Sequence, residues 1–77
     1  MKPIQLKMAR AAVGLGVREL AKKAGVTANT VTRIENGADA KHSTLEALRA
    51  VLEEDVIFLS DGETTVGGPG VRLRERV

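Results

Sequence analysis

The segment 17–37 constrains this 77-residue chain more than any other, because it encodes two short helices separated by a tight turn. Its apolar residues recur at the three- and four-residue spacing of a helical face: Leu20, Ala21, Ala24, Val31 and Ile34. Gly25 suits the turn, and Thr27 offers a side-chain oxygen that can cap the second helix. Helices of about two turns cannot bury their faces alone, so they must pack across the turn and against neighbours.

Two helices joined in this way form a helix-turn-helix, which presents its second helix to the major groove of DNA. We expect this recognition helix to span about residues 28–36. Base-contacting side chains should lie at its start and on its outer face, at Ala28, Asn29, Thr32 and Arg33. Asn29 can pair with adenine, Arg33 can pair with guanine, and Ala28 can contact a thymine methyl group.

The motif and its flanks resemble the Cro/phage-repressor (Xre-type) helix-turn-helix family over roughly residues 4–53. The residues that carry the resemblance are Leu20-Ala21, Ala24-Gly25-Val26, the polar run 27–33, Ile34-Glu35-Asn36-Gly37, Leu6, Arg10, Gly14-Leu15, Leu45, Leu48 and Leu52. The resemblance implies a mainly α, four-helix lambda-repressor-like domain that binds double-stranded DNA. It also implies that Arg10 and Glu35 pair with each other between helices as a structural ion pair.

Contacts to DNA phosphates are expected at helix N-termini and from flanking donors. The family often opens its first motif helix with a polar residue that grips the DNA backbone, but this chain has Val17 there. The backbone amides near Val17 and the side chain of Arg18 are the substitutes. By position, the further candidates for phosphate contacts are Thr27, Asn36, Lys41 and Ser43.

The distribution of charge supports an anionic partner for the motif. Residues 1–40 hold seven basic residues against three acidic ones, whereas residues 41–55 hold two against four and residues 56–77 are balanced. The helix-turn-helix end of the chain is therefore its basic end, as binding to phosphates requires.

The remaining patterns predict a helical domain over residues 1–55 and a strand pair over residues 56–77. Helices are expected over about residues 3–13, 17–24, 28–36 and 43–54. Ser43 and Glu46 should form a capping box at the start of the fourth helix. Short β-prone runs follow at 56–59 and 71–74, with a glycine-rich flexible loop at 60–70 between them.

The predicted strand pair is too apolar to lie exposed on a small domain, and a lone hairpin is marginal in water. We expect it to form a homodimer interface through Val56, Phe58, Val71 and Leu73. Two copies would then hold their recognition helices about one DNA turn apart. The alternative is that the strands fold back onto the fourth helix of their own chain.

Nothing in the sequence supports a catalytic, metal or cofactor site. The chain has no cysteine, and its one histidine, His42, cannot form a metal cluster or a paired acid–base site. Two glycine-rich stretches, 14–16 and 67–70, lack the residues of a dinucleotide or phosphate-binding loop. We expect no enzymatic activity and no cofactor. No run approaches the length of a membrane span, so a cytoplasmic protein is expected.

The leading hypothesis is a sequence-specific transcriptional regulator, such as a bacterial or phage repressor, that binds a palindromic operator as a homodimer. Two alternatives share the same domain. One is the antitoxin of a toxin–antitoxin pair, with residues 56–77 as the segment that binds the toxin partner. The other is a protein-interaction adaptor that has lost DNA binding. The apolar Val17, where the family often has a polar residue that grips the DNA backbone, would permit this.

Overall fold

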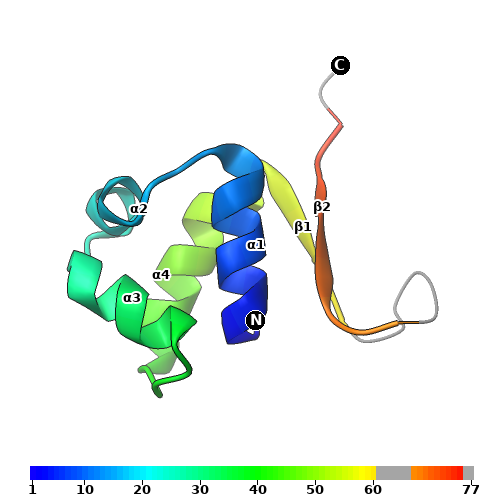
Figure 1. Ribbon diagram of the computed structural model, residues 1–77. Helices are drawn as coiled ribbons and strands as arrows, with labels where there is room; N and C mark the ends of the chain where they lie inside the picture. Colours follow the sequence, from blue (N-terminus) through cyan, green and yellow to red (C-terminus); the bar gives the residue numbers. More distant parts are fainter. Residues whose placement is uncertain (61–66, 76–77) are drawn as a thin grey trace.

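The computed structural model describes residues 1–60 and 67–75. Its elements follow one another as α1 (Pro3–Val13), α2 (Val17–Ala24), α3 (Ala28–Glu35), α4 (His42–Glu53), β1 (Val56–Leu59) and β2 (Gly70–Leu73) (Figure 1). The two strands pair in an antiparallel sheet. This confirms a mainly helical fold of four helices with a two-strand appendage. Of the loop predicted between the strands, residues 61–66 lie outside the described residues.

Local sequence features explain where α1 and α2 end and where α3 begins. Gly14 and Gly25 have left-handed φ angles of 73° and 74° and end α1 and α2, because glycine adopts this conformation without steric cost. At the start of α3, the N–H of Thr30 donates to Thr27 Oγ1 over 3.2 Å. This bond confirms the predicted cap.

The predicted capping box of α4 is wrong. Lys41 has an extended backbone and caps the helix, and no side chain bonds to the cap. Its carbonyl accepts from the N–H groups of Thr44 (3.0 Å) and Leu45 (3.1 Å), so the helix already includes Ser43. A residue inside the first turn cannot act as its N-cap.

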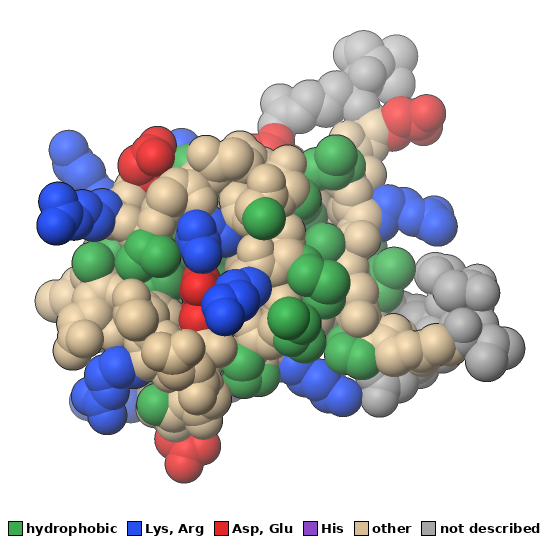
Figure 2. Space-filling view, viewed as in Figure 1, with side chains coloured by type: hydrophobic (Ala, Val, Ile, Leu, Met, Phe, Trp, Pro, Cys, Tyr) green, Lys and Arg blue, Asp and Glu red, His purple; other side chains and the backbone are tan. Residues whose placement is uncertain are grey.

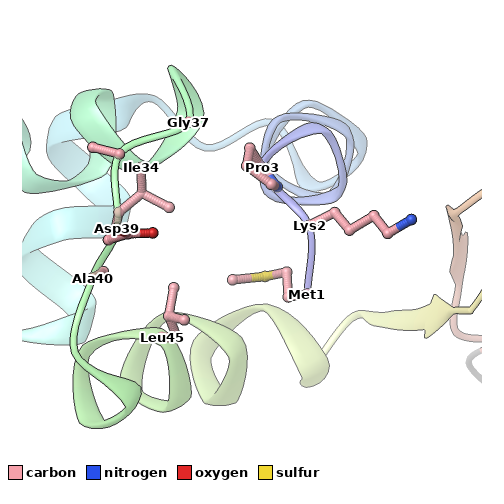
Figure 3. A pocket seen from close by; sticks show the side chains of 9 residues that line it. Met1, Lys2, Pro3, Ile34, Gly37, Asp39, Ala40 and Leu45 are labelled. Carbon is pink, nitrogen blue, oxygen red and sulfur yellow. The ribbon is translucent and has the colours of Figure 1, made fainter.

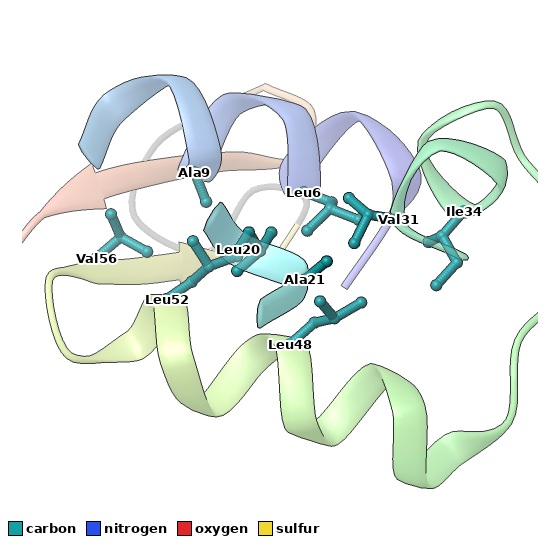
Figure 4. Packing of buried hydrophobic residues seen from close by; sticks show 9 residues of the cluster. All are labelled: Leu6, Ala9, Leu20, Ala21, Val31, Ile34, Leu48, Leu52 and Val56. Atoms are coloured by element: carbon teal, nitrogen blue, oxygen red, sulfur yellow. The ribbon is translucent and has the colours of Figure 1, made fainter. Parts of the chain in front are cut away.

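One core joins all four helices and the first strand (Figure 4). Each helix contributes two buried hydrophobic residues and β1 contributes one; the two are three or four residues apart in α1, α3 and α4 and adjacent in α2. The buried hydrophobic residues are Leu6, Ala9, Leu20, Ala21, Val31, Ile34, Leu48, Leu52 and Val56. The inward residues predicted for the helix-turn-helix thus face the rest of the core, which fixes the orientation of α3.

The strand pair packs on its own chain. It lies against α1 and α4, with Val56 fully buried and with Phe58 and Val71 half-buried against the core. The side chain of Val56 is therefore out of reach of a second copy. Leu73 pairs with Val56 across the sheet but stands at its end and is 58% exposed. The strands thus fold back onto their own chain, as in the alternative, but only β1 packs on α4, and both strands pack on α1, which the sequence analysis did not predict. A strand-mediated homodimer stays a prediction.

Gln5 attaches the strand pair to α1. Its side chain is buried, and its Nε2 donates to the carbonyls of Leu59 (2.7 Å) and Gly70 (3.0 Å). Its Oε1 accepts from the N–H of Lys2 over 2.8 Å. The side-chain amide therefore satisfies two strand carbonyls and the start of a helix at once. The sequence analysis missed this residue.

Candidate nucleic-acid interface

The outer face of α3 is free while its inner face is buried. Val31 and Ile34 pack in the core, and the predicted base-contact residues Asn29, Thr32 and Arg33 are exposed. Ala28 is half-buried and packs against the core cluster. The four predicted residues therefore lie on one short helix, and three of them are exposed.

The residues predicted to contact phosphates occupy the ends of three helices. Arg18 is exposed on α2, Asn36 is exposed where α3 ends, and Lys41 and Ser43 are exposed where α4 begins. Val17 is half-buried against the core, so it offers its backbone rather than its side chain. The hydroxyl of Thr27 already bonds to Thr30, through the amide and, over 2.8 Å, the side-chain oxygen.

Glu19 occupies part of the N-terminus of α2. Its Oε1 accepts from the N–H of Gly16 over 3.2 Å, at an exposed position. A carboxylate in the first turn is favoured by the helix dipole, but it brings a negative charge to the place where a phosphate would approach. The sequence analysis did not single out Glu19. The signal was an acidic residue three positions after the residue that precedes the helix.

Arg10 and Glu35 form a bidentate ion pair between α1 and α3. Arg10 Nε lies 2.8 Å from Glu35 Oε2, and a second guanidinium nitrogen lies 3.1 Å from Glu35 Oε1. A third nitrogen donates to the carbonyl of Leu15 over 3.2 Å. The hydrogen bonds to Glu35 raise the pKa of the Arg10 guanidinium above its ordinary value. Both side chains are thus engaged within the fold, and neither is offered to a ligand.

Two hollows adjoin the end of α3. An open one of about 360 Å³ lies between α3 and the start of α4 and is lined by Thr30, Arg33, Ile34, Asp39, Ala40, Lys41 and Thr44. The other, of about 320 Å³, lies between the start of α1, the end of α3 and the first turn of α4. Figure 3 shows Met1, Ile34 and Leu45 directed into this second hollow. The second hollow is mainly apolar, whereas the first is lined by the cationic side chains of Arg33 and Lys41.

Basic side chains are spread over the surface. Figure 2 shows Lys and Arg side chains at the margin that carries α2 and α3, at the centre of the view and beside β2, with hydrophobic side chains between α1 and β2. Within the described residues, no cluster of three or more His, Asp or Glu side chains could hold a metal ion. None of the described helices is long and apolar enough to cross a membrane.

Comparison with known proteins gives a match over the part of the chain that forms the four helices. A family model described as a helix-turn-helix domain matches residues 4–55. The match begins inside α1 and ends between α4 and β1, so it contains all four helices except the first residue of α1. A search of curated proteins found no match.

Proposed function

The chain belongs to the helix-turn-helix domain family, and we propose that it is a sequence-specific transcriptional regulator of the Cro/phage-repressor (Xre) type that binds its operator as a homodimer. The observation that carries the proposal is α3 itself. Its inner residues are held by the core, while Asn29, Thr32 and Arg33 project from its outer face. A rigid helix with free amide, hydroxyl and guanidinium groups suits the reading of base edges in the major groove.

The surrounding cations fit contacts to the DNA backbone. Lys41 and the first turn of α4 lie across the open hollow from Arg33, so a strand that passes beside α3 would meet them. Arg18 would approach the same strand or its partner from α2. These contacts position the protein without reading sequence. The carboxylate of Glu19 would repel a DNA phosphate at the start of α2. The start of α4 would therefore supply more of the affinity for the DNA backbone.

We expect Asn29→Ala and Arg33→Ala each to cost about 1–3 kcal/mol in specific binding and to relax the base preference at one position of each half-site. The physical reason is the loss of paired hydrogen bonds to a base edge. Arg72→Ala is the matched control, because Arg72 is an exposed arginine on the strand pair. Selection profiles for the three variants would measure the effect. Unchanged profiles for both Asn29→Ala and Arg33→Ala would remove these residues from the interface.

Selection of binding sites from random duplex DNA tests the function as a whole. We expect a palindromic site, two chains per duplex and an affinity that falls linearly with salt on logarithmic axes. An asymmetric site bound by one chain would contradict the homodimer. A chain that shows no salt-dependent retention on DNA would be the adaptor. Stable co-purification with the product of a neighbouring gene would favour the antitoxin. The proposal needs no cofactor and includes no enzymatic step.

A further inference from the structure

The three acidic side chains in the basic half of the chain have different surroundings. Glu35 is buried, and its charge is neutralised by the bidentate pair with Arg10. Asp39 lies on the loop after α3 and lines both hollows, and Figure 3 shows its side chain directed toward the apolar one. Glu19 is exposed in the first turn of α2. It is therefore the acidic residue that lies within the helix-turn-helix and keeps its charge at the surface.

Glu19 is held at the start of α2 by its own helix. Gly16 precedes the helix with an extended backbone and has no side chain that could cap it. The carboxylate of Glu19 supplies the acceptor instead, through the 3.2 Å bond from the N–H of Gly16 to Oε1. Among the four described helices, α2 alone carries an acidic residue in its first turn. The bond fixes the negative charge at the helix start.

We propose that Glu19 limits the affinity of this chain for DNA by holding a negative charge against the phosphate backbone. The inference rests on the DNA binding of the proposed function and adds a residue that opposes it. In a helix-turn-helix, the second helix enters the major groove while the first helix crosses the backbone. Repulsion between a carboxylate on α2 and the phosphates carries no sequence information. Glu19 therefore weakens binding to operator and to random DNA by the same factor.

The helix starts that adjoin the recognition surface differ in charge. The start of α3 is capped by the neutral hydroxyl of Thr27. The start of α4 follows the exposed cation of Lys41, and no side chain bonds to that cap. At the start of α2, the carboxylate of Glu19 offsets both the positive end of the helix dipole and the neighbouring charge of Arg18. Of the three, α2 therefore gives DNA the least electrostatic attraction.

A series of charges at position 19 tests the proposal in the full chain. Glu19→Gln removes one charge but keeps an oxygen that can accept from Gly16, and Glu19→Lys changes the charge by one more unit. The probe is a short duplex of random sequence. We expect each step to tighten binding by about threefold to tenfold at low salt. The gain should shrink as the salt concentration rises, because added ions screen the repulsion.

Glu75→Gln and Glu75→Lys are the matched controls. Glu75 is exposed and follows β2, on the opposite side of the molecule from α2 and α3 (Figure 1). The two series change the net charge equally, so they differ only in where the charge lies. We expect the control series to change affinity by less than about twofold per step. Circular dichroism and thermal unfolding check that each variant keeps the fold. Equal gains from both series would overturn the proposal, and so would unchanged or weaker binding by a folded Glu19→Gln variant.

The base preference separates this role from base reading. Site selection with Glu19→Gln should return the wild-type profile, in contrast to Asn29→Ala and Arg33→Ala. A changed profile would make Glu19 a base-contacting residue and overturn the inference. Absence of DNA binding in both the wild type and Glu19→Gln would overturn the proposed function. Wild-type binding that Glu19→Gln leaves unchanged would overturn the inference alone, whereas binding that appears only in Glu19→Gln would support it and contradict the proposed function.

Discussion

Arg10→Met alone and Glu35→Leu alone are each expected to lower the free energy of unfolding by about 3–5 kcal/mol, and the double change is expected to cost less than either. Each single change strands one charge of a pair that is 22% exposed on the arginine side and 5% exposed on the glutamate side. The double change replaces both charges by apolar side chains of similar size. It removes the cross-link between α1 and α3 without leaving a buried charge uncompensated.

Urea denaturation of the wild-type chain and the three variants measures this effect, provided that the denaturant slopes agree. The pair Arg49–Glu53 is the control, because its nitrogen–oxygen distance is 2.6 Å but both side chains are more than a third exposed. Loss of that surface pair should cost about 0–1 kcal/mol. Small and additive costs for Arg10→Met and Glu35→Leu would show that the inter-helix pair is no more coupled than the surface pair.

Truncation after Glu54 is expected to abolish cooperative folding. The deletion removes Val56, which is fully buried in the core, and uncovers the side of α1 against which Phe58 and Val71 pack. Loss of a buried valine costs about 1.5–3 kcal/mol, and the amide of Gln5 loses both of its carbonyl acceptors, at about 1–3 kcal/mol. These terms together approach the whole stability of a small domain, about 5–15 kcal/mol.

Thermal unfolding followed by circular dichroism would show the loss as a broad, low-amplitude transition. A chain that ends at Glu75 keeps both strands and serves as the control. A truncated chain with a sharp transition near the wild-type midpoint would mean that residues 1–54 fold independently of the strands. The expected result also has a practical consequence. Deletion of the strands cannot test dimerisation by itself, because it alters the fold, whereas substitutions on the surface can.

Local signals in the sequence predicted the helical part of the fold closely. Glycines that end helices, a threonine cap and apolar residues at helical spacing are short-range features, and each acts within one or two turns. The bounds of α2 agree with the prediction, and α1 and α3 differ from it by no more than a residue at one end. The motif also led to the pairing of Arg10 with Glu35, which the structure contains.

The features that the sequence analysis missed depend on longer-range geometry. Gln5 stands four residues before Ala9 on an apolar stripe, but its acceptors lie 54 and 65 residues away. No pattern near Gln5 specifies those partners. The misplaced cap of α4 had a different cause, since Ser43 and Glu46 satisfy the capping pattern equally well wherever the helix begins. In the structure the extended backbone at Lys41 decides the boundary.

The link from Gln5 to Gly70 has a consequence for how the protein is made. The side chain of Gln5 is synthesised 65 residues before one of its two acceptors, the carbonyl of Gly70. Val56, which completes the core, also comes late in the chain. Contacts between such distant residues form slowly, because a long loop must close first. The core and the hydrogen bonds of Gln5 can therefore be completed only after residues 56–70 have been synthesised.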